Sequence, residues 1–437
     1  MSNETTKLVR ASLKKRYLKE KLFRGFGVAA IVASLGFLVI LLGSIFIKGY
    51  PAFQASYLNI DVTFNEDTLG VASIDTDEDF RSANFGKAMK EAMYERFPDV
   101  SKRKDKKRLY QLVSSGAEYA LSDYLKANPD QFGKTVSLWI LADDEADALI
   151  KRNKDLTAPI KRGENKNNND AIVTRLNEDQ LGWLKSIKDA GDTEVRLSES
   201  FFMNGNSREA EQAGIRAALV GSAYTLLITF ILSFPIAVAA AIYLEEFAPQ
   251  NRWTDLVEVN INNLAAVPSI VFGLLGLAVF INYLALPRSA PVVGGIVLSL
   301  MTLPTIIISS RAALKSVPPS IREAARGLGA SRVQVVTHHV LPLAMPGILT
   351  GTIIGLAQAL GETAPLLMIG MVAFIVDVPS SVTAPSTVLP VQVFLWADAP
   401  ESAFKERTSA AILVLLAFLI VMNLAAVLLR KKLERKW

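Results

Sequence analysis

Cysteine and histidine, the residue types of thiol catalysis, histidine-based triads and zinc sites, are scarce in this sequence. The 437 residues include no cysteine, and the two histidines, His338 and His339, are adjacent. A zinc-type site needs several ligands, and no further histidine or cysteine exists to complete one. We therefore predict no catalytic residue and no metal site, and we expect the histidine pair to lie at a solvated helix end.

One ionisable residue lies within a long apolar run. Glu362 belongs to the stretch GLAQALGETAPLLMIG, and an ionisable side chain at membrane depth costs at least about 2.5 kcal/mol, which makes it a functional candidate. The alternatives are that Glu362 lies nearer an interface, or is protonated and pairs with a neighbouring helix. Together with Glu362 we assign Gln358, Thr363 and Pro365 to a candidate translocation pathway.

A charged segment, Arg311–Pro342, separates two apolar runs. Within it, Ile321–Leu328 predicts a short amphipathic helix. Pro318 and Pro319 favour a helix start, because proline suits the first turn. Gly329 favours a helix end, because glycine readily adopts positive φ. A second periodic run follows, whose apolar face would hold Val333, Val336 and Val340.

The composition indicates a membrane region joined to a soluble domain. Hydrophobic residues make up 51% of the chain and charged residues 20%, with a mean hydropathy of +0.30 and a formal net charge of +5. A chain of this composition is too apolar for an ordinary soluble protein and too charged to lie wholly in lipid.

The order of segments along the chain predicts its domains and topology. A basic flank (1–24) would stay in the cytoplasm and precede a retained signal anchor (25–47), long enough to cross the hydrocarbon core. Residues 48–213 would form one extracytoplasmic domain, 214–430 a membrane core containing the loop 311–342, and 431–437 a basic cytoplasmic tail. Six spans are expected, with both termini cytoplasmic: Gly25–Ile47, Ala217–Tyr243, Leu264–Tyr283, Val292–Ser310, Leu343–Phe374 and Ala410–Leu429.

The segment 48–213 has mixed periodicity. Phe85–Phe97 and Lys107–Lys126 have helical spacing, Thr135–Leu141 alternates like a strand, and residues 161–170 are typical of a solvated loop. The sequence Gly-Lys-Thr at 133–135 does not complete a phosphate-binding loop, since residue 128 is asparagine where the first glycine would stand. We predict an α/β or mainly α domain.

Each of the four middle spans contains a proline: Pro235, Pro268, Pro304 and Pro365. A buried proline frees a backbone carbonyl that lipid cannot satisfy, so these helices should face other helices or a watery cavity. Membrane helices also carry prolines more often than soluble ones, which is the simpler explanation. We assign Pro268 and Pro304 to the candidate pathway.

The charged segment resembles the EAA loop of ATP-binding-cassette (ABC) importer permeases. Glu323-Ala324-Ala325, three residues, Gly329 and then Leu341-Pro342 match its spacing, with His339 at a position that is usually aliphatic. The resemblance implies an all-α polytopic permease of the type I, MetI-like kind. It also implies that the loop docks on an ATPase subunit, with six candidate coupling residues: Arg322, Glu323, Ala324, Ala325, Arg326 and Gly329.

Three stretches resemble the phosphate-importer branch of these permeases, the PstA type: GETAPLL, IYLEEFAP at 242–249 and NLAAVPSIVFGLLGLAVF at 263–280. Gln358 stands where that branch often has a basic residue, and the 48–213 insertion exceeds its usual loop. The resemblance implies a bacterial inner-membrane protein that works with a second permease (PstC type), an ATPase dimer (PstB type) and an extracytoplasmic phosphate-binding protein (PstS type). ATP and Mg would be bound by the ATPase, leaving no cofactor in this chain, and nucleic acid is not expected as a partner.

Two other functions remain open at this level. The cargo could be another oxyanion or small solute, although GETAPLL argues against it. A membrane sensor with a ligand-binding domain at 48–213 is the second alternative. Sensors usually have one or two spans and a large cytoplasmic output domain, which this chain lacks by the predicted topology.

Overall fold

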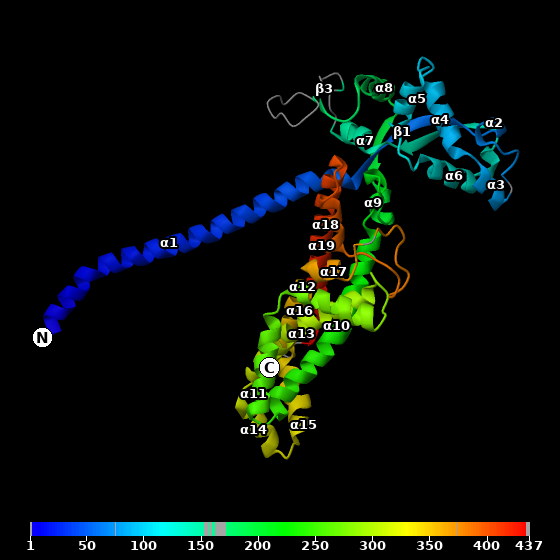
Figure 1. The fold of residues 1–437 in the computed structure, drawn as a ribbon. Helices are drawn as coiled ribbons and strands as arrows, with labels where there is room; N and C mark the ends of the chain where they lie inside the picture. The colour runs from blue at the N-terminus through cyan, green and yellow to red at the C-terminus, as the bar shows by residue number, and fades with distance from the viewer. Residues whose placement is uncertain are drawn as a thin grey trace.

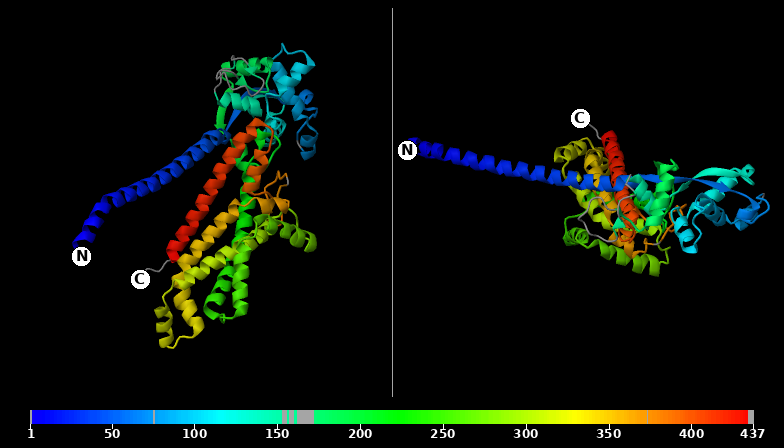
Figure 2. Two further views of the ribbon diagram at one scale, coloured as in Figure 1. Left: turned by 60° about the vertical axis from the view of Figure 1, so that its left-hand side comes forward. Right: turned by 90° about the horizontal axis from the view of Figure 1, so that it is seen from above.

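The computed structural model describes residues 2–74, 76–152, 156, 160–161, 172–372 and 374–433. It comprises a long N-terminal helix, α1 (Ser2–Gly49), then an inserted domain, and a bundle of apolar helices (Figure 1). The inserted domain lies at one end of the bundle, and the loop with α14 (Pro319–Gly327) and α15 (Arg332–Gln334) lies at the other (Figure 2).

The inserted domain is built on a three-stranded antiparallel sheet of order β2-β1-β5. The strands are β1 (Gln54–Thr63), β2 (Thr135–Leu141) and β5 (Thr193–Leu197), and the bounds of β2 are those predicted. Because successive side chains of a strand point to opposite faces, alternate β1 residues enter one core: Leu58, Ile60 and Val62 are buried.

Helices and short turns complete this domain. Ile160–Lys161 (β3) and Ile172–Val173 (β4) form a separate parallel pair, and residues 162–170 of the predicted solvated loop lie outside the described residues. The helices are α2 (Glu66–Leu69), α3 (Asp77–Ser82), α4 (Phe85–Arg96), α5 (Arg103–Tyr110), α6 (Ala117–Ala127), α7 (Asp144–Lys151), α8 (Glu178–Asp189) and α9 (Glu199–Met203).

The helix predicted at Phe85–Phe97 is confirmed, but the one at Lys107–Lys126 is wrong. The chain leaves the helix at Tyr110 and starts a new one at Ala117. Between them, the Ser114 N–H donates to the Leu141 carbonyl at 2.9 Å, extending the sheet edge. Tertiary pairing with the end of β2 therefore overrides the local helical periodicity.

The bundle contains the remaining helices. Its π-helical turns are η4 (Tyr243–Phe247), η5 (Gly276–Tyr283) and η6 (Val335–Val340). Its α-helices outside the loop are α10 (Arg216–Ile242), α11 (Arg252–Ala265), α12 (Ser269–Leu275), α13 (Pro291–Lys315), α16 (Leu341–Gly361), α17 (Ala364–Met368), α18 (Leu389–Ala397) and α19 (Ser402–Leu433). The chain is therefore mostly helical with one small sheet domain, as predicted.

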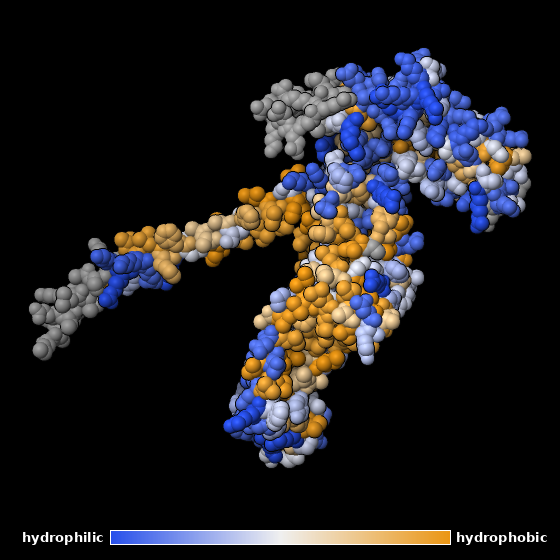
Figure 3. All heavy atoms as spheres, in the orientation of Figure 1, coloured by the Kyte–Doolittle hydropathy of each residue, from blue (hydrophilic) through white to orange (hydrophobic). Residues whose placement is uncertain are grey.

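Within the described residues, five helical stretches are long and apolar enough to cross a membrane: Lys15–Phe53, Arg216–Phe247, Pro291–Lys315, Arg332–Gly361 and Ser402–Lys432. The stretch in α1 projects to one side of the bundle, and the apolar side chains of the other four form a band between the hydrophilic inserted domain and the hydrophilic loop (Figure 3). This distribution is that of a chain whose middle lies in lipid.

Two predicted spans differ from the structure. The run Leu264–Tyr283 is not one helix: α11 and α12 meet at an angle of 101°, and Pro268 is the N-cap residue of α12 rather than an interior proline. The run Leu343–Phe374 ends as a helix at Gly361, so Pro365 lies in the first turn of the short α17. Val267, the residue before Pro268, disfavours α geometry, and Pro365 has no N–H with which to bond the Gly361 carbonyl four residues earlier.

Interior prolines are present elsewhere in the bundle. Pro235 lies inside α10 and Pro304 inside α13, as predicted, and Pro346 inside α16 was not considered from the sequence. α1 contacts the bundle near its end, where Gly49 lies against the backbone of Ser409 and Ala410 in α19.

Candidate functional site

The helix, glycine and second helix predicted within Arg311–Pro342 are present, and backbone hydrogen bonds define the turn between them. We call this segment, residues 319–340 with α14, Gly329, α15 and η6, the knuckle. α14 begins directly after Pro318, and Gly329 has φ of +84°. The N–H of Gly329 donates to the Arg326 carbonyl at 2.9 Å and that of Ala330 to the Ala325 carbonyl at 3.1 Å. This is the Schellman arrangement, in which a glycine in the left-handed region ends a helix. The sequence prediction of a stop at Gly329 is confirmed.

The second half of the knuckle begins with a capping box. The Ser331 hydroxyl accepts from the Gln334 N–H, and the Gln334 side chain accepts from the Ser331 N–H. The predicted apolar face is partly wrong, because Val333 is 59% exposed while Val335, Val336 and Val340 are buried. The π-helical turn η6 changes the angular spacing of the side chains, so the period of an α-helix does not apply there.

The outer surface of the knuckle holds most of the predicted coupling residues. Glu323, Ala324, Arg326 and Gly329 are exposed, whereas Ala325 is buried against the bundle. Leu328 is 90% exposed next to Gly329, and sequence reasoning did not single it out. An apolar residue adjoining the glycine of a charged loop is the signal that could have identified it.

Arg322 differs from the other predicted coupling residues, because its side chain points into the protein. Its Nη2 donates to Glu246 Oε1 at 2.7 Å and to the Leu314 carbonyl at 2.9 Å, and its Nη1 donates to the Val317 carbonyl at 2.6 Å. The structure thus joins the acidic pair of IYLEEFAP to the EAA segment, 76 residues apart in the chain.

The candidate pathway residues near Glu362 lie at a helix break or one turn before it, rather than all inside one span. Glu362 is the C-cap residue of α16, half-buried, and among the described residues its side chain has no hydrogen-bond or ion-pair partner. Thr363 follows it, while Gln358 is exposed one turn earlier. Pro365 is buried against Gly273 of α12. The structure therefore brings α12 and α17 together beside Glu362.

The other sequence candidates are placed apart. Pro304 is buried inside α13 and Pro268 is exposed at the start of α12. His338 and His339 are exposed on η6, as predicted, and no group of three or more possible metal ligands occurs in the part of the chain that the structure describes.

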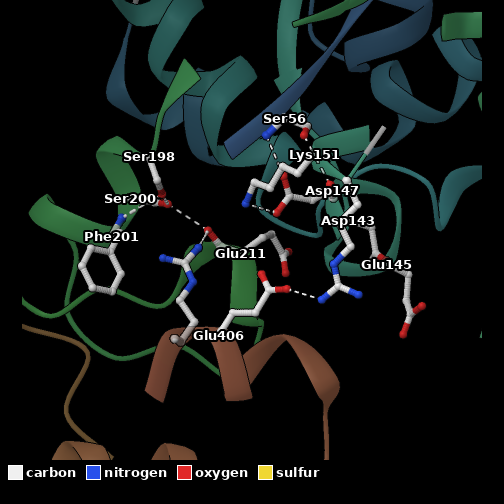
Figure 4. Close-up of polar contacts among 12 residues, drawn as sticks. Ser56, Asp143, Glu145, Asp147, Lys151, Ser198, Ser200, Phe201, Glu211 and Glu406 are labelled. Carbon is white, nitrogen blue, oxygen red and sulfur yellow. Dashed lines mark hydrogen bonds and ion pairs between the residues drawn. The ribbon is translucent and has the colours of Figure 1, made fainter. Parts of the chain in front are cut away.

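A buried cluster of charges joins the inserted domain to α19, and the sequence did not reveal it (Figure 4). Arg407 of α19 is 4% exposed and donates to the carbonyls of Ala213 at 3.0 Å and Glu211 at 2.9 Å. The Glu211 carboxylate accepts from the Ser114 hydroxyl at 2.6 Å. Arg152 pairs with Glu406 at 2.5 Å.

The domain side of this junction is α7. Asp147 pairs with Lys151 at 2.5 Å and accepts from the backbone N–H of Ser56 at 2.7 Å, so α7 is held to β1 (Figure 4). Burial and the neighbouring charge of Asp144 raise the pKa of Asp143 to about 8. Burial also raises the pKa of Glu211 and lowers that of Lys151. The only sequence signal was the acidic run Asp143–Asp147, which is too common on helix starts to be specific.

Taken together, the apolar bundle and the Schellman-capped knuckle at its end define a polytopic α-helical membrane permease. Comparisons with known proteins agree. Residues 233–437 match the family described as binding-protein-dependent transport system inner membrane component, and residues 10–160 match a domain of unknown function (DUF3333).

Several curated relatives align with about half of the chain. The phosphate transport system permease protein PstA 2 of Mycobacterium tuberculosis (strain CDC 1551 / Oshkosh) is 31% identical over 224 residues, 51% of this chain and 74% of that protein. PstA of Yersinia pestis is 31% identical over 221 residues, 50% of this chain and 73% of that protein. The chain belongs to the family of ABC importer permeases and is close to PstA within it.

Two further comparisons differ in coverage. The probable ABC transporter permease protein YqgI of Bacillus subtilis (strain 168) is 35% identical over 173 residues. This alignment covers 39% of this chain and 58% of YqgI. A solved structure of the inward-facing MetNI methionine ABC transporter is 19% identical, with a TM-score of 0.41, covering 50% of this chain and 97% of the solved chain.

Proposed function

We propose that this chain is the membrane permease subunit of an ATP-driven importer of inorganic phosphate. The observation that carries the proposal is the knuckle: a glycine-capped helix pair that presents Glu323, Ala324 and Leu328 outward at one end of an apolar bundle. The phosphate assignment is supported by the PstA relatives. Such a loop has the shape and exposure to fit a groove of an ATPase subunit.

The proposed assembly is the one that the resemblance to PstA-type permeases implies. An ATPase dimer would hold the knuckle and would bind ATP and Mg. A second permease of the PstC type would complete the pathway, and a phosphate-binding protein of the PstS type would deliver the anion. Both termini and the knuckle would then be cytoplasmic, and the inserted domain extracytoplasmic. Gln358, Glu362 and Thr363 would line the pathway where α16 ends.

The experiment is reconstitution of the chain with its membrane partners in proteoliposomes, followed by ATP-dependent uptake of labelled phosphate. Glu323→Lys should abolish uptake and release the ATPase on purification, because it reverses the charge of one side chain on the outward face of the knuckle. Asp255→Lys is the matched control, since Asp255 is an exposed carboxylate on α11 outside the knuckle.

Two outcomes would contradict the proposal. Uptake of sulfate but not phosphate would change the cargo while keeping the class. Full phosphate uptake by Glu323→Lys, with the ATPase retained, would remove the coupling role from the knuckle.

A further inference from the structure

Six charged residues meet beneath the knuckle, where α10, α11, α13 and α14 come together. Glu245 and Glu246 come from η4 and Glu258 from α11, while the cations are Arg311, Lys315 and Arg322. We call these six residues the anchor cluster. Glu245 and Glu246 belong to the stretch IYLEEFAP, which the sequence singled out only by its resemblance to PstA-type permeases.

Arg322 makes more hydrogen bonds than the other residues of the anchor cluster. Its Nε and Nη2 donate to Glu246 Oε1 at 3.1 and 2.7 Å, a two-donor contact that is stronger and more directional than a single ion pair. The side chains of Arg322 and Glu246 are 17% and 7% exposed. The pair is therefore largely desolvated, and removing one partner leaves a buried charge without compensation.

The same guanidinium also holds the end of α13. Its bonds go to the carbonyl of Leu314, in the last turn of α13, and to the carbonyl of Val317, two residues beyond that helix. Carbonyls in the last turn have no N–H partner four residues on within the helix, so they can accept from a side chain. A cation at this position is further favoured by the helix dipole. One side chain of α14 thus connects to the ends of both α10 and α13.

A second group of contacts supports the first. Arg311, at 16% exposed, lies 2.5 Å from Glu258 and 3.5 Å from Glu245. Lys315 lies 3.6 Å from Glu245 but is 61% exposed, so solvent screens its contribution. These contacts tie α11 and the end of α13 to η4, the turn that carries Glu246.

α14 has few other means of keeping its orientation. It has nine residues, too few for a helix to be stable by itself. Within it Ala325 is buried and Ile321 is partly buried in the same apolar cluster, so its apolar contact with the bundle is small. A push on the outer face of α14 would therefore turn it against the bundle unless the anchor cluster resisted.

We infer that the Glu246–Arg322 pair, supported by the rest of the anchor cluster, fixes the knuckle to the ends of α10 and α13 so that movement of the knuckle is passed to both helices. Arg322 is then a positioning residue, and its assignment as a docking contact on the ATPase is replaced. This inference rests on the proposed function, because it names the contact that passes movement of the knuckle on the ATPase to the membrane helices.

The first test measures phosphate uptake and ATP hydrolysis together in the reconstituted complex. Glu246→Gln and Arg322→Gln should keep the ATPase bound and hydrolysing, while uptake per ATP hydrolysed falls about fivefold or more, the lower end of the usual range of allosteric coupling. The double variant should be no worse than Arg322→Gln alone, because Glu246→Gln removes only an interaction that Arg322→Gln has already removed. Asp255→Asn and Arg252→Gln, exposed residues of α11, are the matched controls.

The second test does not depend on transport. Because the chain has no cysteine, spin labels at Leu328→Cys on the knuckle and Ile236→Cys on α10 report the distance between the two elements in the full chain in nanodiscs. Glu246→Gln and Arg322→Gln should broaden the distance distribution, and Asp255→Asn should leave it unchanged.

The two tests separate the inference from the proposed function. An unchanged distance distribution, additive effects in the double variant, or release of the ATPase by Glu246→Gln would overturn the anchoring role. Absence of ATP-driven phosphate uptake by the parental complex would overturn the proposed function instead, while the distance measurement would still decide whether the pair fixes the knuckle.

Discussion

Gly329 shows how one residue determines the direction of the knuckle. Its φ of +84° is a conformation that costs a residue with a Cβ about 1–2 kcal/mol, and a Cβ there would meet no other atom within 4 Å. The cost is therefore conformational and not steric crowding. Gly329→Val should leave membrane insertion intact and reduce both transport and ATPase retention.

The control for this prediction is Gly327→Ala. Gly327 lies inside α14, where alanine is favoured over glycine and where a Cβ also meets no atom within 4 Å. The readouts are ATP-driven uptake and the amount of ATPase recovered with the purified chain. Equal transport by the valine and alanine variants would show that the left-handed turn is dispensable.

Asp143 predicts a pH dependence of stability. Its pKa in the folded chain is raised from 3.8 to about 8 by burial and the charge of Asp144. The folded state therefore holds this proton more tightly, so its contribution to stability is complete below pH 4 and is lost as the pH rises toward 8. The raised pKa of Glu211 acts in the same direction.

Asp143→Asn should reduce this dependence, because asparagine resembles the protonated acid. The measurement is the melting temperature of the full chain in detergent at pH 5.5 and 8.5, where a change of 1 kcal/mol corresponds to about 2–4 °C. The variant should lose fewer degrees between the two pH values than the parental chain. An identical loss in both would assign the pH dependence to other groups.

At the scale of elements, small residues let α10 approach its neighbours closely. A Cβ at Gly221 would overlap the carbonyl oxygen of Thr387, and one at Gly295 of α13 would lie 2.6 Å from the Ile228 side chain of α10. Membrane helices lack a hydrophobic driving force for association, so close backbone packing is a main source of their stability.

Gly221→Ala should therefore destabilise the bundle, by about 1–3 kcal/mol as for other overpacked cores. Gly36→Ala in α1, where a Cβ meets no atom within 4 Å, is the matched control and should not lower the melting temperature. The comparison is made by thermal unfolding in detergent. A Gly221→Ala chain as stable as the control would mean that the 386–388 segment moves aside without cost.

At the scale of the whole molecule, the inserted domain and the knuckle lie at opposite ends of the apolar band (Figures 1 and 3). The proposed topology places them on opposite sides of the membrane. Single cysteines at Ala127 of α6 and Ser331 of the knuckle, both exposed, test it. In intact cells, a membrane-impermeant thiol reagent should label position 127 and miss position 331. Labelling of both from outside would contradict the topology.

The sequence by itself determined the features that depend on local interactions. Proline and glycine set the bounds of α14, alternation set those of β2, and the lengths of the apolar runs located the helices that span the bundle. These signals are reliable because the backbone conformations of proline, glycine and short periodic segments depend on neighbouring residues.

Only the tertiary structure decided which distant charges meet and where apolar runs break. Arg322 lies opposite Glu246, and Arg407 opposite the Glu211 carbonyl, because helix packing brings together segments that are far apart in the chain. The 101° bend between α11 and α12 and the end of α16 before Glu362 likewise follow from how neighbouring helices fill space. Composition and periodicity do not encode these contacts, since many residues of the same type could have made them.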